Sequence, residues 1–74
     1  MIEGRLGYNR ENGRYGLLVM DLWEVEGFHC GQIVSVKIAG EWVDTRFEMN
    51  YRNEWYLVGT DLAGNDLEFL KARI

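Results

Sequence analysis

A strict alternation of apolar and polar side chains begins at Ile33 and constrains the fold more than any other feature. In the run IVSVKI, apolar residues alternate with Ser35 and Lys37. Side chains two positions apart share one face of a strand, so this period predicts a strand with one buried and one exposed face. A helix would need apolar residues at i, i+3, i+4 and i+7, and glycines interrupt every such window. The chain is therefore predicted to be all-β.

A second alternating run, EWVDTRFEM, spans residues 41–49 and directly follows Ala39-Gly40. We expect these two residues to form a tight hairpin, because glycine readily adopts the positive φ that a two-residue loop requires. The second strand then has one face directed at the core and one directed at solvent. The inward residues are predicted to be Val43, Thr45, Phe47 and Met49, and the outward residues Trp42, Asp44, Arg46 and Glu48.

The remaining elements follow from short apolar runs separated by turn residues. The sequence has no proline and nine glycines, so Gly and Asn must supply the turns. Further strands are predicted at 5–8, 14–20, 54–59 and 71–74, with turns at 9–13, 50–53 and 63–66. Residues 21–31 are predicted to be a long loop, and Leu67–Leu70 one 3₁₀ turn. Trp55 and Leu57 are assigned to the core, and Tyr56 to the outer face with Glu54.

Together these elements predict an all-β fold, a small SH3-like β-barrel of about five strands with a 3₁₀ turn before the last strand. Closing a small sheet into a barrel would remove its exposed edges. At 74 residues the chain is expected to form a single domain, 1–74, with a core rich in aromatic side chains. An OB-fold is the alternative architecture, although it usually needs a longer chain.

Several short motifs, taken in order along the chain, resemble a family of bacterial proteins. They are GRYGL (13–17), FHCG (28–31), GEWVDTRFE (40–48), WYLVG (55–59) and LEFLKARI (67–74). The family they resemble comprises short uncharacterised proteins of Gram-positive origin, often carried on conjugative elements and prophages and classed as a domain of unknown function. The resemblance spans nearly the whole chain. It implies an SH3-like barrel and a mobile-element setting, and it supplies no activity and no catalytic residue.

The charge balance makes nucleic acid the less expected partner. The formal net charge is −4, whereas duplex nucleic acid is bound largely through Lys and Arg. The basic residues are scattered along the sequence, and no cluster of them indicates a phosphate-binding surface. No apolar run approaches the roughly 20 residues of a membrane span, and the N-terminus lacks a signal-peptide pattern. We therefore expect a cytoplasmic location and no membrane partner.

Catalysis and metal binding have little support in the sequence. His29 and Cys30 are the only residues of their kind, and neighbours in an extended segment point in opposite directions, so they do not form a dyad. A structural zinc site needs four ligands. We expect no enzymatic activity, no cofactor and no metal, with Cys30 half-buried as a small hydrophobic residue and His29 capping a loop. A metal site shared across a dimer is the alternative.

The outward face of residues 41–49 is the first candidate binding surface. Trp42, Arg46 and Tyr56 would lie near one another across a hairpin if their side chains point outward. Aromatic residues with arginine are enriched at binding hot spots. The alternative is that Trp42 covers an open end of the barrel or packs under the 21–31 loop.

The 21–31 loop is the second candidate surface. Trp23 and Phe28 lie in it among Asp21, Glu24 and Glu26. SH3-like barrels that bind peptides commonly place aromatic residues beside acidic loop residues, and an acidic loop favours a basic partner. The alternative is that Trp23 and Phe28 fold inward and enlarge a small core.

Two functions remain for a chain of this kind. The first is a non-catalytic protein-interaction module of bacterial or mobile-element origin, which binds an unidentified protein or peptide or a second copy of itself. The second is a nucleic-acid-associated accessory protein of a conjugative element or prophage, which uses aromatic stacking and a few arginines.

Overall fold

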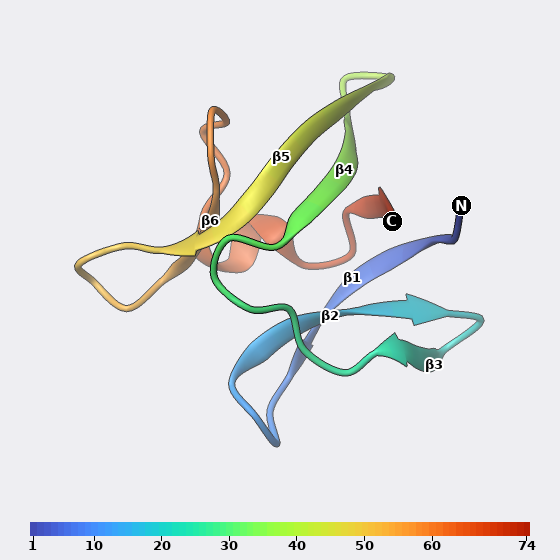
Figure 1. Ribbon diagram of the computed structural model, residues 1–74, viewed down its shortest axis with the longest axis horizontal. Coiled ribbons are helices and arrows are strands. Elements are labelled where there is room, and N and C mark those ends of the chain that lie inside the picture. The colour runs from blue at the N-terminus through green and yellow to red at the C-terminus, as the bar shows by residue number, and fades with distance from the viewer.

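The computed structural model describes residues 1–74 and contains seven strands and one 3₁₀ helix (Figure 1). In chain order they are β1 (Glu3–Asn9), β2 (Arg14–Val19), β3 (Leu22–Val25), β4 (Ile33–Ile38), β5 (Glu41–Met49), β6 (Trp55–Leu57), η1 (Gly64–Leu67) and β7 (Lys71–Arg73). All strands belong to one sheet with the order β3-β2-β1-β7-β4-β5-β6, and every pairing is antiparallel. The all-β fold class is therefore confirmed.

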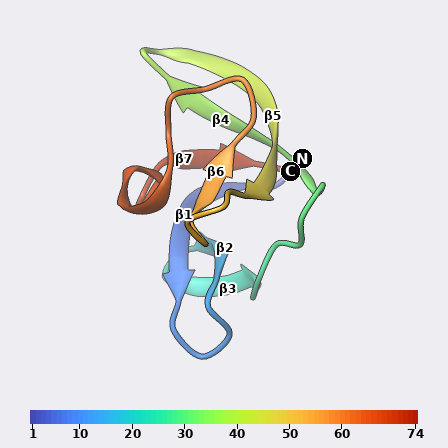
Figure 2. The same ribbon diagram turned by 90° about the vertical axis from the view of Figure 1, so that its left-hand side faces the viewer.

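The sheet folds over on itself without closing into a barrel. The C-terminal strand β7 lies between β1 and β4, so it joins the layer of β1, β2 and β3 to the layer of β4, β5 and β6 (Figures 1 and 2). The prediction of about five strands in a closed barrel is wrong, because seven strands are present and β3 and β6 remain as edges. Asp21, Glu24 and Glu26 are exposed along β3, and charged side chains are a common protection for a sheet edge.

Residues 21–31 are not a single loop, because Leu22–Val25 form strand β3 against β2. Met20 and Asp21 make the connection, with φ of 52° and 65°. Two positive φ values are typical of a type I′ turn, which usually carries Gly or Asn. Neither glycine nor asparagine is present here, and β3 lacks an alternating pattern, so this hairpin has no clear signal in the sequence.

The hairpin predicted at Ala39-Gly40 is confirmed. Both residues have positive φ, 51° and 82°, and the register pairs Ile38 with Glu41. The faces of β5 are also as predicted over its central part, since Thr45 and Phe47 are buried while Asp44 and Arg46 are exposed. Met49 is the exception. It was assigned to the core but is 39% exposed, because the end of β5 extends past the packed interior.

The 3₁₀ turn before the last strand is confirmed as an element, but it occupies Gly64–Leu67 rather than Leu67–Leu70. The carboxylate of Asp66 accepts a hydrogen bond from the backbone N–H of Ala63 at 3.3 Å. This local bond starts the helix at the residues that were expected to form only a turn. Leu67 at its end is fully buried.

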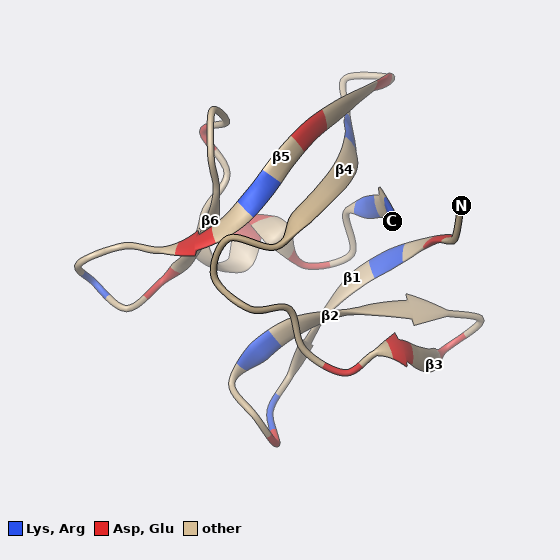
Figure 3. Cartoon of the chain, in the orientation of Figure 1, with Lys and Arg blue, Asp and Glu red and all other residues tan.

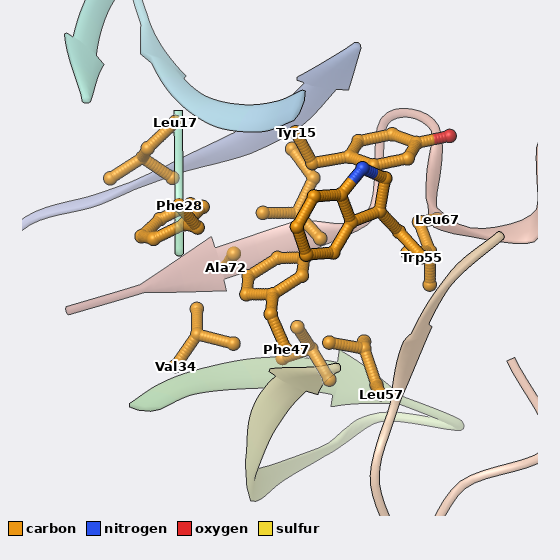
Figure 4. Packing of buried hydrophobic residues seen from close by; sticks show 11 residues of the cluster. Tyr15, Leu17, Phe28, Val34, Phe47, Trp55, Leu57, Leu67 and Ala72 are labelled. Carbon is orange, nitrogen blue, oxygen red and sulfur yellow. The ribbon is translucent and has the colours of Figure 1, made fainter. Parts of the chain in front are cut away.

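Eleven residues from both layers form one hydrophobic core (Figure 4). They are Leu6, Tyr15, Leu17, Phe28, Val34, Val36, Phe47, Trp55, Leu57, Leu67 and Ala72. The assignment of Trp55 and Leu57 to the interior is confirmed. The chain contains no helix with the length and apolar character required to span a membrane.

Candidate functional site

A cleft of about 290 Å³ opens between the β1–β2 turn, the β5–β6 turn and η1. We call it the aromatic cleft. Its lining residues are Tyr8, Gly13, Tyr15, Met49, Asn53, Glu54, Trp55, Gly64 and Asn65. The side chains of Tyr8 and Met49 are 43% and 39% exposed, so the cleft has apolar walls that reach solvent.

Two buried aromatic residues at the cleft use their polar atoms inside the protein. The indole Nε1–H of Trp55 donates to the carbonyl oxygen of Gly13 at 2.8 Å. The hydroxyl of Tyr15 donates to the carbonyl oxygen of Gly64 at 2.8 Å, and Figure 4 shows both side chains among the buried residues of the core. These bonds tie the β1–β2 turn to β6 and the start of η1 to β2. Both rings are almost fully buried, so the surface open to a ligand comes from Tyr8 and Met49.

The surroundings of the cleft are acidic. Glu54 lies in its lining, and Glu68 lines an adjoining hollow of about 350 Å³ together with Tyr8, Arg10 and Asn65. Burial raises the pKa of the Tyr15 phenol to about 12, and the negative charge of Glu68 contributes to the same shift. Burial, the larger cause, disfavours a charge of either sign, whereas the contribution of Glu68 has the sign that favours a nearby cation.

The basic residue Arg14 already makes contacts within the protein beside the cleft. The guanidinium carbon of Arg14 lies 5.4 Å from the centre of the Trp55 ring. Arg14 Nη1 also donates to the carbonyl oxygen of Phe28 at 3.0 Å. This contact shows that the face of Trp55 accepts a cation in the folded protein.

The three residues predicted on the outer face of β5 and β6 are not brought together. Tyr56 pairs with Glu48, whose carboxylate oxygen lies 3.3 Å from Arg46 Nε. Trp42 lies near the other end of β5. It is six residues from Glu48, which corresponds to about 20 Å because a strand rises about 3.3 Å per residue. Its ring contacts Arg73, whose guanidinium carbon is 4.1 Å from the ring centre. Trp42 therefore belongs to a different part of the surface from Arg46 and Tyr56.

Trp23 lies on the outer face of β1, β2 and β3. It is therefore outside the core, but it packs against these strands. Gly7 and Gly16 pair with each other on adjacent strands, and the indole covers both. A Cβ added at Gly16 would come within 2.9 Å of Trp23 Cζ3, and one at Gly7 within 3.4 Å of Cη2. The side chain remains 37% exposed.

Phe28 is not available as a surface residue. It is 1% exposed and stacks on Phe47 in the core. The prediction that Phe28 forms part of a binding surface is therefore wrong, and the alternative that it folds inward is correct. Residues near it in sequence are polar, so its burial depends on contacts with distant strands.

Residues 4–74 match the family described as a domain of unknown function, DUF5348. The chain belongs to the DUF5348 family. It is also similar to a protein from Ruminococcus gnavus, whose crystal structure was a target of the Northeast Structural Genomics Consortium. The identity is 36%, with 99% of this chain and 100% of that chain covered and a TM-score of 0.81. The comparison with curated proteins gives no match.

In this DUF5348 domain, His29 and Cys30 lie at the surface. Cys30 is exposed rather than half-buried. The backbone N–H of His29 donates to Gln32 Oε1 at 3.0 Å, which closes the short turn before β4. No group of three or more His, Cys, Asp or Glu side chains is arranged to hold a metal ion.

The walls of the aromatic cleft in this DUF5348 domain were missed from the sequence. Tyr8 shares a strand face with the buried Leu6 and is expected from the sequence only as a strand residue, and Met49 is expected in the core. The only available signal was that both residues end a strand immediately before a turn rich in Asn. That two such turns meet at one cleft depends on the pairing of β7 between β1 and β4.

Proposed function

We propose that this domain is a non-catalytic protein-interaction module whose aromatic cleft binds a short, extended peptide segment carrying a basic side chain. One observation carries the proposal. Trp55 and Tyr15 satisfy their polar atoms internally, while Tyr8 and Met49 offer apolar walls open to solvent. Ligand sites combine apolar walls with a few polar or charged groups, and Tyr8, Met49 and Glu54 supply both kinds here.

The expected basic side chain follows from the charges around the cleft. Glu54 and Glu68 provide complementary charge, which gives specificity and speeds association. Aromatic faces also attract Lys and Arg, as the existing contact of Arg14 with Trp55 illustrates. A segment that places one basic and one apolar residue in the cleft would use both features.

An SH3-like relationship, an origin on a bacterial mobile element and a cytoplasmic location are further parts of this proposal. The resemblance in sequence motifs supports the first two. Aromatic-lined grooves are also the surfaces with which SH3 domains bind extended peptides. A reducing cytoplasm would keep the exposed Cys30 as a free thiol.

Selection from a phage-displayed library of random twelve-residue peptides tests the proposal. We expect enrichment of peptides that combine Lys or Arg with an apolar residue. The double variant Glu54→Gln/Glu68→Gln should bind the selected peptides at least about fivefold more weakly, because it loses the charges that attract a cation. Peptides without basic residues, or no enrichment at all, would contradict the proposal.

The matched control is Glu24→Gln/Glu26→Gln, which removes the same charge from the β3 edge. We expect it to bind the selected peptides within about twofold of the parent chain, since exposed charges at a distance are screened by salt. Equal weakening in both double variants would show that net charge, rather than the aromatic cleft, determines binding.

A further inference from the structure

The outer face of the sheet gathers basic residues that are scattered in the sequence. Arg5 of β1 pairs directly with Lys71 of β7. The register of β4 and β7, continued by one residue, places Lys37 beside Lys71. Lys37 in turn pairs with Trp42 of β5. These residues therefore form one row across four neighbouring strands, and Figure 3 shows the basic segments of β1, β4 and the C-terminal strand around it.

Arg73 completes this surface from the next row of β7. Its guanidinium carbon lies 4.1 Å from the centre of the Trp42 ring, and Lys37 Nζ lies 5.7 Å from the same centre. We call Arg5, Lys37, Lys71 and Arg73, with Trp42 beside them, the cationic face. It combines four of the eight basic residues of an otherwise acidic chain with one aromatic ring.

The basic side chains of the cationic face form no ion pair within the protein, although Glu3 lies opposite Arg73 and lines a hollow with Arg5, Lys71 and Asp21. None of its four basic residues has a carboxylate within 4.0 Å, since the one ion pair in the chain joins Arg46 and Glu48. Like charges directly opposite each other on adjacent strands, as at Arg5 and Lys71, are destabilising. In addition, Nε of Arg73 is buried without a hydrogen-bond partner. The like-charge pair and the unpaired Nε thus lie on one surface. A bound anion would reduce the repulsion between Arg5 and Lys71.

We propose that the cationic face binds a single strand of nucleic acid. Its phosphates would contact Arg5, Lys37 and Lys71, and a base would pack against the stack of Arg73 and Trp42, because bases stack on aromatic rings and on guanidinium planes. The row spans three strand spacings, about 15 Å, which suits a few nucleotides of one backbone. A duplex would also bring its second backbone against a domain of net charge −4.

The cationic face is separate from the aromatic cleft. Trp42 lies near one end of β5 and Met49 at the other, about 23 Å apart at the rise of a strand. The two surfaces can therefore be tested independently. The Glu54→Gln/Glu68→Gln variant should bind nucleic acid at least as well as the parent chain.

Fluorescence anisotropy of a labelled, mixed-sequence twelve-nucleotide DNA strand, measured from about 20 to 150 mM salt, tests the proposal. Three phosphate contacts predict a slope of roughly −2 for log K against log salt, because each contact to a single strand contributes about −0.7. Arg5→Gln and Lys71→Gln should each reduce the slope by about 0.7 and weaken binding about tenfold at 20 mM salt. Both variants should keep or raise the melting temperature, because each removes a like-charge pair.

Arg10→Gln and Arg52→Gln are matched controls, since both residues are exposed and lie outside the cationic face. They should change affinity by less than about twofold. The proposal is overturned by equal loss in controls and test variants, by the absence of binding at 20 mM salt, or by tighter binding of the corresponding duplex. A poly-glutamate peptide of equal charge that displaces the labelled strand as effectively as unlabelled DNA does would also overturn the proposal. The site would then recognise negative charge and not nucleic acid.

Discussion

The ring of Phe28 stacks on the ring of Phe47, with centroids 4.7 Å apart and 13° between their planes. Phe28 follows β3, whereas Phe47 lies in the middle of β5, so this stack joins the two layers of the folded sheet. The backbone N–H of Phe28 also donates to the carbonyl oxygen of Tyr15 at 2.7 Å. Phe28 therefore anchors the segment between β3 and β4 to the core, while its neighbours His29 and Cys30 remain exposed.

Phe47→Ala should lower the free energy of unfolding by about 3 to 5 kcal/mol, because it leaves a cavity among fully buried side chains. Phe28→Ala should lower it by a similar amount. Trp42→Ala should cost clearly less, since the ring is only partly buried and packs under Arg73. Urea unfolding of the three variants gives these values. A Phe47→Ala protein as stable as the parent would mean that β5 presents its other face to the core.

Gly16→Ala should destabilise the domain more than Gly7→Ala. A Cβ at Gly16 would collide with the carbonyl oxygen of Val25, so the backbone of β3 would have to shift. At Gly7 the nearest atom is Cδ1 of the flexible Leu18 side chain, 2.6 Å away. We expect a loss of about 2 to 3 kcal/mol for Gly16→Ala and about 1 kcal/mol for Gly7→Ala. Thermal unfolding distinguishes them, and the reverse order would refute this account of the paired glycines.

The stability of the domain should fall between about pH 10 and pH 12 as Tyr15 ionises. Burial, and then the charge of Glu68, raises the pKa of Tyr15 to about 12 in the folded state, whereas an unfolded tyrosine titrates near about 10. Between these values the folded chain retains a proton that the unfolded chain loses, so the free energy of unfolding decreases as pH rises. Below pH 10 this group contributes no pH dependence.

Tyr15→Phe provides the control for this effect. The variant loses the hydrogen bond to Gly64 and should be less stable at neutral pH. Its free energy of unfolding should nevertheless fall less steeply than that of the parent from pH 10 to 12. Denaturant unfolding at several alkaline pH values, with ultraviolet detection of phenolate, measures both quantities. Parallel curves for the two proteins would show that Tyr15 titrates normally.

Ala39→Asn should stabilise the domain by about 1 kcal/mol. Ala39 has φ of 51° in the β4–β5 turn, a left-handed conformation that is unfavourable for alanine and tolerated by asparagine. The substitution also creates Asn-Gly, the preferred pair for a type I′ turn. Chemical denaturation provides the comparison. A destabilised variant would indicate that residue 39 is held by contacts other than the turn geometry.

Much of the sheet could be predicted because its signals are local. The alternation in β4 and β5 and the glycine at position 40 define a hairpin without reference to the rest of the chain. By contrast, β3 has neither an alternating pattern nor a glycine turn. Its pairing with β2 places Trp23 over Gly7 and Gly16, which lie 16 and 7 residues before it in the chain. A contact of that kind leaves no periodic trace.

The cationic face and the aromatic cleft could be predicted from the sequence only in part. An outward Trp42 followed from the period of β5, and so did an outward Arg46. Their neighbours did not follow, because these depend on which strands lie side by side. Pairing of the last strand with β1 and β4 brings Lys71 and Arg73 to Trp42, and it also brings η1 to the cleft.

The amino-acid sequence by itself determined that the chain is all-β, where its central hairpin turns and which side chains of β5 face inward, because these properties depend on residues adjacent in the chain. Only the tertiary structure decided that β7 is inserted between β1 and β4, that Phe28 is buried and that scattered basic residues share one face. Pairing between distant strands selects one register among many, and that choice rests on how the whole core packs.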